Sequence, residues 1–330
     1  MSLFSLIVVL LLEQVRPLPY QKFVHGPLAR LADFLEARFN AGEPGQGMVA
    51  WLIAVPGLTL GVGLIYLLLH SINPLLALAC NIGVLYLTMG FRQFSHYYTD
   101  IQLALRMGDL AHARRLLAEW RGQPADDLSS SEIARLAIEE ALAASHRHVF
   151  GVLLWFVLLP GPCGAVLYRS ASFFSDYWGA KRENYRRQPF SAGSAEIVGL
   201  TDLTESVFGD FGSFAQRVFA IIDWLPLRVT AAGFAIVGNF EDAILCWRTQ
   251  AANWPDGGLG IVLASGAGAL GVRLGMPVVE AGEVAGRADI AIGDAADVDF
   301  MQSAVGLVWR ALVLWLLLLL LLVLASLVGG

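Results

Sequence analysis

Long apolar runs dominate the pattern of hydrophobic and polar positions, and their lengths predict membrane-spanning helices. The clearest run, Ser303–Val328, is interrupted only by Arg310 and is long enough to cross a hydrocarbon core of about 30 Å. Met48–Leu69 and Pro74–Phe91 form two further runs, which a polar, proline-marked turn joins into a predicted membrane hairpin. The opening run, Ser2–Leu12, has no basic residue ahead of it and predicts a retained, partly inserted anchor, not a cleaved signal peptide.

Two other apolar stretches contain breaks that a plain spanning helix would not have. Val149–Tyr168 contains Pro160-Gly-Pro, and Val218–Gly238 contains the polar and proline-bearing stretch Asp223–Arg228. A re-entrant hairpin turning at Pro160 would keep the basic segment 169–217 on the cytoplasmic side, as the positive-inside rule favours. Irregular backbone at membrane depth is tolerated where it is buried in protein or lines a wet cavity, so both breaks predict a site.

The segment between these apolar groups, residues 92–148, has the pattern of water-exposed helices. Ala104–Trp120 has helical periodicity and predicts one helix, and a polar connection, Gly122–Ser130, follows it. Ser129 and Glu132 fit a capping box, which predicts that the next helix starts there. Arg135 can form an ion pair with Glu139, four residues later on that helix. Further along, Ser191–Gly212 and Glu280–Asp299 are rich in small and acidic residues and predict surface loops.

Composition agrees with membrane residence and excludes several classes of function. The 330 residues are 56% hydrophobic and 15% charged, with a formal net charge of -6 and a mean hydropathy of +0.61. Basic residues occur in short clusters beside apolar runs, so nucleic-acid binding is not expected and anionic lipid headgroups are the better partners. The three cysteines have no C-x-x-C spacing, which argues against a disulfide framework and a zinc site.

Charged residues near or inside the apolar runs are the candidates for chemistry. Asp223 and Arg228 would each cost about 2.5–3.5 kcal/mol at a bilayer centre, so we expect them to face protein, each other or water. A site satisfies that requirement, and so does a structural ion pair or an interfacial anchor next to Trp224. Glu139 could act as a base or bind a metal, whereas Glu140 points about 100° away and does not form a converging pair with it.

Two more groups have a functional and a plain structural interpretation. His146 and His148 lie on opposite faces of a helix and predict a cationic collar at the interface, or contact with phosphate or a headgroup, and not a shared metal. Gly266–Gly271 fits G-x-G-x-x-G after the strand-like stretch Gly260–Ala264, but small residues at helical spacing are typical of close membrane-helix packing. Arg273, in the same region, could bind an anionic ligand or pair within the protein.

Five motifs follow one another over about residues 100–280: Ala104–Asp109 with Ala113–Arg115, Glu139–Trp155, Gly164–Arg169, Asp223–Thr230, and Gly268–Gly275 with Pro277. Their order and sequences resemble the CobD/CbiB superfamily of cobalamin biosynthesis. Shorter stretches, Met1–Phe4, Leu12–Arg16 and Asp223–Arg228, are similar to AmpE, a membrane protein of the same superfamily associated with β-lactamase induction.

The superfamily resemblance implies an amide ligation that joins cobyric acid to an aminopropanol or its phosphate, with ATP and Mg²⁺. Such chemistry needs carboxylates for the metal and cations for phosphate. The apolar and glycine framework of the family is present, but several of its polar positions differ. The family's acids and amides fall here on Ala143, Ala144, Arg147, Phe219 and Ala220 and near Ser172 and Ser175, and one Asn becomes Asp223.

These observations together predict an all-α, polytopic membrane protein with broken or re-entrant helices, located in the bacterial inner (plasma) membrane. The expected divisions are residues 1–91 (anchor and hairpin), 92–148 (cytoplasmic helices), 149–302 (broken helices around the site) and 303–330 (the last spanning helix). The partners are the bilayer and a corrinoid or other anionic small molecule, and oligomerisation is left open. The alternatives are a non-enzymatic AmpE-like sensor or signalling modulator and a scaffold for a membrane complex. By the superfamily resemblance, the catalytic carboxylates are Glu139, Asp109 and Asp223, and the anion-binding residues are Arg169, Arg228, Arg273, His146 and His148.

Overall fold

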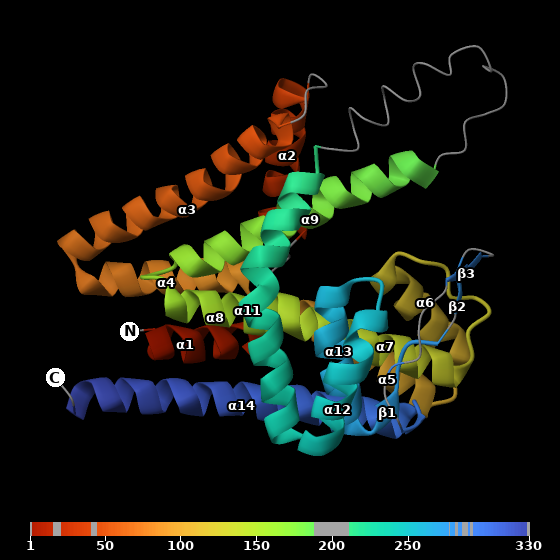
Figure 1. Cartoon of the computed structure of the whole chain (residues 1–330). Helices are drawn as coiled ribbons and strands as arrows, with labels where there is room; N and C mark the ends of the chain where they lie inside the picture. Colours follow the sequence, from red (N-terminus) through yellow and green to blue (C-terminus); the bar gives the residue numbers. More distant parts are fainter. Residues whose placement is uncertain are drawn as a thin grey trace, which may run out of the picture. The chain divides into compact units, whose positions relative to one another are not determined.

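Helices make up nearly all the regular structure of the protein, for which we analysed a computed structural model (Figure 1). The structure describes residues 2–15, 21–40, 45–187, 211–276, 278–280, 283–285, 290 and 293–328. Within these residues four helices are long and apolar enough to cross a membrane, by length and composition: Gln46–Ile72, Ser130–Leu158, Ser213–Val237 and Val298–Ser326. The predicted all-α, polytopic fold is therefore confirmed.

The chain divides into two compact units, each made of two separate segments. Unit 1 comprises residues 1–89 and 152–223, and unit 2 comprises residues 90–151 and 224–330. The helices of unit 1 are α1 (Ser2–Val15), η1 (Gln21–His25), α2 (Gly26–Phe39), α3 (Gln46–Ile72), α4 (Pro74–Thr88) and α9 (Cys163–Arg187), with most of α8 (Gly151–Leu158) and the first part of α11 (Ser213–Val237). Unit 2 has the rest of α11 and α5 (Phe91–Arg106), α6 (Leu110–Arg121), α7 (Ser130–Ser145), η2 (His146–Phe150), α12 (Phe240–Gln250), η3 (Ala251–Asn253), α13 (Gly257–Leu270) and α14 (Val298–Val328).

The predicted membrane hairpin of unit 1 is formed by α3 and α4, which pack against each other (Figure 1). Asn73 ends α3 and caps α4, because its side chain accepts the Leu75 backbone N–H at 2.8 Å. Leucines on the outer face of α3, such as Leu60 and Leu67, are exposed. A large exposed apolar face on a spanning-length helix is the surface that lipid tails cover.

The predicted turn at Pro160 is present between α8 and α9 in unit 1. The chain leaves the helix after Leu158, and Gly161 takes a left-handed φ of 63°. Beyond the turn, the Gly164 Cα lies directly against the Trp155 carbonyl, where a Cβ would overlap the backbone. The sidedness of this hairpin in the membrane stays a prediction.

The predicted break at Asp223–Arg228 is wrong, because α11 continues as one helix through Pro226. A proline has no N–H for the carbonyl four residues earlier, which here is the carbonyl of Ile222. The indole Nε1 of Trp155 donates to that carbonyl at 3.2 Å. The freed acceptor is thus satisfied from a neighbouring helix, which removes one of the two costs of a proline inside a helix.

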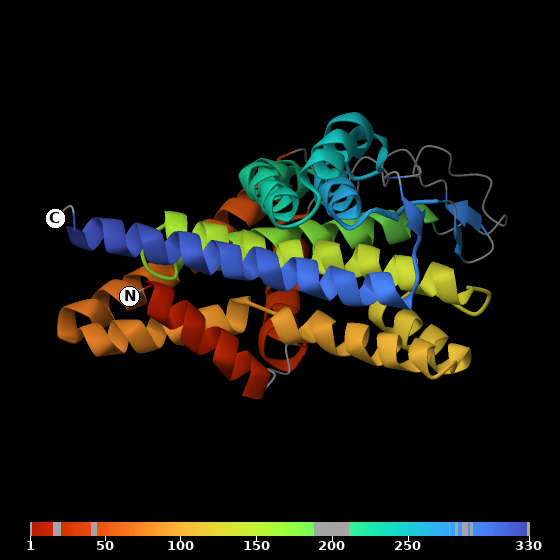
Figure 2. The same ribbon diagram turned by 90° about the horizontal axis from the view of Figure 1, so that it is seen from below.

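In unit 2, α7 is buried on all sides and packs against α5, α6, α13 and α14. Figure 2 shows α14 running alongside α7. Phe150, at the end of the π-helix that continues α7, lies in the aromatic core with Phe234 and Trp315. A helix that is buried all round is normally apolar, so the buried charged residues of α7, Arg135 and Glu139, are exceptional.

The prediction of one helix over Ala104–Trp120 is wrong, since the chain forms α5 and α6 with a turn between them. Gly108 adopts a left-handed φ of 75°, which interrupts the helix, and Asp109 caps the next one. Periodicity alone missed the turn because apolar residues continue with helical spacing on both sides of it.

The region after α11 corrects two further predictions. Gly260–Ala264 is not strand-like, because it lies inside α13, which packs tightly on α12 (Figure 1). A Cβ on Gly268 would meet the backbone of Asp242 on α12, so close packing explains the small residues.

The predicted loop at 280–299 instead contains short strands: β2 (Val278–Glu280) pairs with β3 (Glu283–Ala285), and β4 (Asp294–Ala295) pairs with β1 (Val272–Arg273). Most of the predicted loop 191–212 lies outside the described residues.

Candidate functional site

A buried ion pair on α7 is the most unusual polar feature of unit 2. The capping box between Ser129 and Glu132 fixes the start of α7, as predicted. Arg135 and Glu139 then lie one helical turn apart, each about 5% exposed, with 4.0 Å between Arg135 Nε and Glu139 Oε1. The predicted pairing is confirmed, and its burial makes it costly unless the surroundings compensate.

A short loop after α13 contacts this pair directly. The backbone N–H of Gly275 donates to Glu139 Oε1 at 2.8 Å. The loop leaves α13 at Gly271, with a left-handed φ of 68°, and Gly275 and Met276 are left-handed too, at 90° and 54°. This backbone course gives Glu139 a hydrogen-bond donor from an element more than a hundred residues away in sequence.

Arg273 lies in the same loop, but its side chain does not share the buried position of Glu139. It is exposed, and its Nε donates to the Gly293 carbonyl at 2.9 Å. Gly293 is pressed so closely against the Gly271 backbone that a Cβ would overlap it. The Arg273 side chain therefore connects the loop to the backbone at Gly293. Its role in anion binding stays a prediction.

Of the two histidines beyond α7, His146 does not have the exposed position that the predicted collar requires, and the collar at His148 stays a prediction. His146 is fully buried, and its Nδ1 lies 2.9 Å from the Thr230 hydroxyl. His148 is half-buried, and Arg147 between them pairs with Asp256 at 3.7 Å. All three lie in a π-helical turn, a widened helix that is frequent at functional sites.

The described contacts of Arg228 are with Trp224, four residues earlier on its own helix. Its Nη1 donates to the Trp224 carbonyl at 2.9 Å, and its guanidinium lies 4.1 Å from the centre of the Trp224 ring. Stacking on an indole and bonding to the helix's own backbone accommodate a half-buried cation beside an apolar face.

Asp223 and Arg169 belong to unit 1, and both are buried. Tyr168, the residue before Arg169 on α9, donates its hydroxyl to Asp223 Oδ1 at 2.8 Å. This bond connects α9 with α11 and stabilises a carboxylate inside a span-length helix. The structure thus distributes the predicted site residues over both units, and the contacts above define where each lies within its unit.

Asp109, predicted to be catalytic, has a structural role in the described contacts. It is exposed, and its Oδ1 accepts the His112 backbone N–H at 2.9 Å, as the N-cap of α6. Asp109→Ala should lower the free energy of unfolding by about 1 kcal/mol, whereas Asp109→Asn should lower it far less, because Asn caps nearly as well. Thermal unfolding of both variants tests the cap. Loss of function in Asp109→Asn at an unchanged Tm would instead support a catalytic carboxylate.

Among the described residues, no three His, Cys, Asp or Glu side chains converge as a metal site would require. The three cysteines, Cys80, Cys163 and Cys246, are all free thiols. Arg135 was noted from the sequence only as the partner of Glu139. Its place beside the apolar positions Ala134 and Leu136 of that helix was the available signal for burial.

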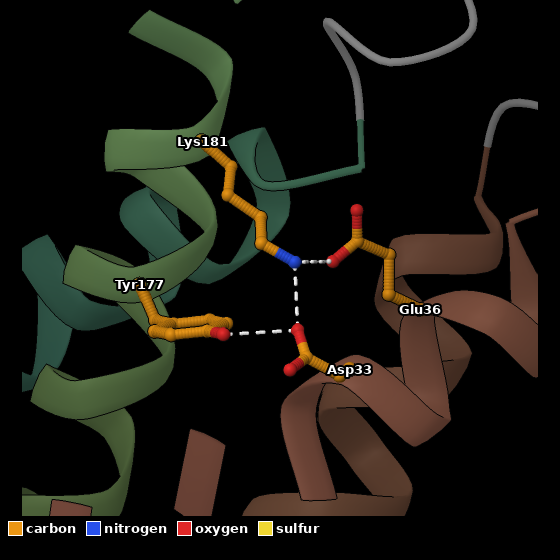
Figure 3. A network of polar contacts seen from close by, with 4 residues as sticks. All are labelled: Asp33, Glu36, Tyr177 and Lys181. Atoms are coloured by element: carbon orange, nitrogen blue, oxygen red, sulfur yellow. Dashed lines mark hydrogen bonds and ion pairs between the residues drawn. The ribbon is translucent and has the colours of Figure 1, made fainter. Parts of the chain in front are cut away.

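Unit 1 contains a separate polar network, which the sequence did not predict. Figure 3 shows Lys181 of α9 between two carboxylates of α2, with Nζ 2.7 Å from Asp33 Oδ1 and 2.8 Å from Glu36 Oε2. The Tyr177 hydroxyl also donates to Asp33, at 2.9 Å. The network connects two helices that are far apart in sequence, so it fixes α2 against α9.

Lys181→Met should weaken this attachment by roughly 0.2–1 kcal/mol, the range for exposed ion pairs. The hydrogen bond from Lys181 holds the pKa of Asp33 below its ordinary 3.8, so that contribution is present above pH 3.8 and is lost as pH falls through the lowered pKa. Burial disfavours the Lys181 cation, but the bonds to Asp33 and Glu36 outweigh it and raise its pKa above the ordinary 10.5. Its contribution is therefore complete below pH 10.5 and is lost as pH rises through the raised pKa.

The Tm difference between wild type and Lys181→Met should thus be constant from about pH 5 to pH 9 and shrink in strong acid. Arg30→Met, a change at an exposed position of the same α2 helix, is the matched control and should leave Tm nearly unchanged. A difference that varied steeply near neutral pH would contradict this assignment.

Comparison with known proteins points to a single family. Residues 11–196, more than half of the chain, match the family described as CobD/Cbib protein. The cobalamin biosynthesis protein CobD of Stutzerimonas stutzeri is 33% identical over 325 residues, which cover 97% of this chain and 98% of that protein. CobD of Chromobacterium violaceum is 33% identical over 242 residues (73% and 70%), and CbiB of Salmonella typhimurium is 27% identical over 305 residues (88% and 88%). No solved structure matches the chain.

Proposed function

Because the chain belongs to the CobD/CbiB family of cobalamin biosynthesis proteins, we propose that it forms the amide bond between a corrinoid carboxylic acid and an aminopropanol or its phosphate. The observation that supports this best is Glu139, a buried carboxylate fixed by the Gly275 N–H and placed one turn from Arg135. A carboxylate and a cation in a shielded position suit a reaction between an acid and an amine, because low dielectric strengthens their action on developing charge.

In the proposed reaction the amine nitrogen attacks the activated carboxyl carbon, the C–N bond forms, and the group on that carbon leaves. The nitrogen must also lose a proton, and Glu139 is the proposed acceptor. Asp223 and Arg169 are buried in unit 1, and no step of the proposed reaction at Glu139 in unit 2 is assigned to them. Proton transfer by a positioned side chain typically contributes a factor of about 10² to 10⁴ in rate.

ATP and Mg²⁺ are the activating pair that the family resemblance implies. The donor set of the described residues does not fit a magnesium site made of protein ligands. The Asp109 carboxylate already accepts the His112 N–H as a helix cap. Ala143 and Ala144 occupy the positions where the family has a glutamate and an asparagine. No three metal-binding side chains converge among the residues that the structure describes. No step of the proposed reaction is therefore assigned to the metal.

The reaction is proposed to take place at the bacterial inner membrane, crossed several times by the chain. Four span-length apolar helices support residence in a bilayer, and the relatives named above are bacterial proteins. Basic segments beside the predicted hairpin support a cytoplasmic location for the residues between α4 and α7.

A second candidate function is a non-enzymatic, AmpE-like membrane sensor that retains the fold and binds a ligand. The alanines at 143 and 144 favour it, since they remove polar groups from α7 while leaving its packing intact. In a sensor, Glu139 and Arg135 would hold a ligand without chemistry.

Genetic complementation separates the two functions. Expression in a bacterial strain that lacks its own cobinamide-phosphate synthase should restore cobalamin synthesis, and Glu139→Ala should fail to do so. Membrane insertion and monodisperse elution of the purified protein are the controls for folding. Failure of the well-folded wild-type chain to complement would exclude the enzymatic function and favour the sensor.

A further inference from the structure

Arg135 has more hydrogen-bonding capacity than the described residues use. Its side chain is about 6% exposed, and its Nε and Nη2 are buried with no hydrogen-bond partner among the residues that the structure describes. The carboxylate oxygen paired with it, Glu139 Oε1, lies 4.0 Å away, beyond hydrogen-bond length, and that oxygen already accepts the Gly275 N–H.

A buried arginine whose N–H donors have no hydrogen-bond partner is rare in a protein interior. A guanidinium carries five N–H donors in a planar fork, and buried polar groups are normally satisfied. An arginine used only for structure would lie within hydrogen-bond distance of its acceptor, as Arg114 does with the Leu128 carbonyl at 2.9 Å. The geometry at Arg135 leaves donors available for a group that the protein itself does not supply.

The loop beside the pair has the backbone of a ligand-binding segment. Gly275 and Met276 are consecutive left-handed residues, and Met276 is the one non-glycine residue with a positive φ in the described structure. Left-handed backbone at a residue with a side chain is strained, and such strain is concentrated at ligand sites and switches. Glu139 holds this loop one helical turn from Arg135, so its contact with Gly275 positions the segment.

Two other cations of unit 2 that were candidates for binding an anion, Arg228 and Arg273, already have acceptors. Arg228 donates to the Trp224 carbonyl and stacks on that indole, and Arg273 donates to the Gly293 carbonyl. Arg135 is in addition the most deeply buried of the three. Removal from water strengthens an ionic hydrogen bond, which makes this cation the best suited to a small anionic group.

We propose that Arg135 binds an oxyanion of a reactant through its Nε and Nη2 fork, in a site closed by the Gly271–Met276 loop that Glu139 holds. This inference rests on the proposed function, which supplies two sources of the oxyanion: the carboxylate of the corrinoid acid and the phosphate of aminopropanol phosphate. A planar guanidinium recognises either group with two parallel hydrogen bonds.

The test is calorimetric binding to the full-length protein in nanodiscs of zwitterionic lipid. The probes are aminopropanol phosphate, unphosphorylated aminopropanol and cobyric acid, each titrated separately. Arg135→Gln should weaken binding of one anionic probe by roughly 10- to 100-fold, the loss expected for hydrogen bonds to a charged group. Arg135→Lys should recover part of it, because a lysine keeps the charge without the fork. Arg115→Gln, the same charge change at an exposed position of unit 2, should bind like wild type.

The probe that loses affinity identifies the source of the oxyanion. Loss confined to aminopropanol phosphate assigns the phosphate, and loss confined to cobyric acid assigns the carboxylate. If wild type binds the anionic probes and Arg135→Gln binds them equally well, this inference is wrong and the proposed function is untouched. If wild type binds none of the probes, the proposed function fails and this inference with it.

A second variant covers the case in which Arg135→Gln does not fold. The double variant Arg135→Met/Glu139→Leu replaces the buried pair with apolar side chains, a change that proteins often tolerate. It should fold and show the same loss of affinity as the single variant, roughly 10- to 100-fold. Binding equal to wild type by this folded double variant would overturn the proposal.

Discussion

Gly164→Leu is expected to prevent unit 1 from folding. Gly164 is the second residue of α9, and its Cα faces the Trp155 carbonyl across the Pro160 turn. A side chain at this position would overlap the backbone atoms of Trp155 and Phe156, and no rotamer can relieve an overlap that begins at Cβ. Overpacking typically costs about 1–3 kcal/mol, and a collision with backbone belongs at or beyond the upper end of that range.

The readout is the yield and elution profile of the detergent-solubilised protein, with Tm where a folded fraction remains. Gly61→Leu is the matched control, because Gly61 lies on the exposed face of α3, where an added Cβ would have no atom within 4 Å. The control should express and melt like wild type. Equal yields and Tm values for the two variants would contradict the close approach of α8 and α9.

Glu139→Ala is expected to be the most damaging single change in unit 2. It removes the counter-charge of a buried arginine and the acceptor of the Gly275 N–H at once. Breaking a buried ion pair by removing one partner costs roughly 3–5 kcal/mol, because the remaining charge is left uncompensated. Glu139→Gln should cost less, since its amide oxygen can still accept the Gly275 N–H.

A double variant that removes both charges distinguishes a role in stability from a role in function at this pair. In Arg135→Met/Glu139→Leu no buried charge remains, so the Tm should recover most of what Glu139→Ala loses. Complementation should nevertheless remain absent, because both proposed functional groups are gone. If the double variant recovered both its Tm and complementation, the pair would be shown to stabilise the fold without taking part in function.

The spanning helices could be predicted from the sequence because their signal is local. Met48–Leu69 is apolar throughout and Ser303–Val328 is interrupted only by Arg310, and each coincides with a span-length helix of the structure. The capping box at Ser129 is equally local, as it requires only residues three apart. Predictions of this kind depend on one segment at a time.

Two of the errors came from positions where a distant partner determines the outcome. Pro226 predicted a break in α11, yet the Trp155 indole satisfies the carbonyl that the proline leaves open, and no periodicity reveals that. The turn at Gly108 is local and its glycine was overlooked, whereas the strands near residue 272 form by pairing with a segment some twenty residues away. Helix or strand assignment there depends on pairing that a local pattern does not contain.

The candidate site was predicted in part. Glu139 was proposed from its place on a predicted helix and from the family resemblance. Asp223 was proposed because a charged side chain inside an apolar run has a high free-energy cost in a bilayer. The importance of Arg135 was missed because its burial and its unused donors are properties of packing. His146 was misplaced at an interface for the same reason, since Thr230, on a different helix, is its described partner.

The central claim is that this membrane protein forms a corrinoid amide bond, and its product can be measured directly. Purified full-length protein in nanodiscs would be incubated with cobyric acid, aminopropanol phosphate, ATP and Mg²⁺, and the corrinoids analysed by mass spectrometry. We predict a product whose mass equals the two reactants joined with loss of one water, absent with Glu139→Gln, which keeps an acceptor for the Gly275 N–H. Binding of both reactants by the folded wild-type protein without any such product would contradict the claim.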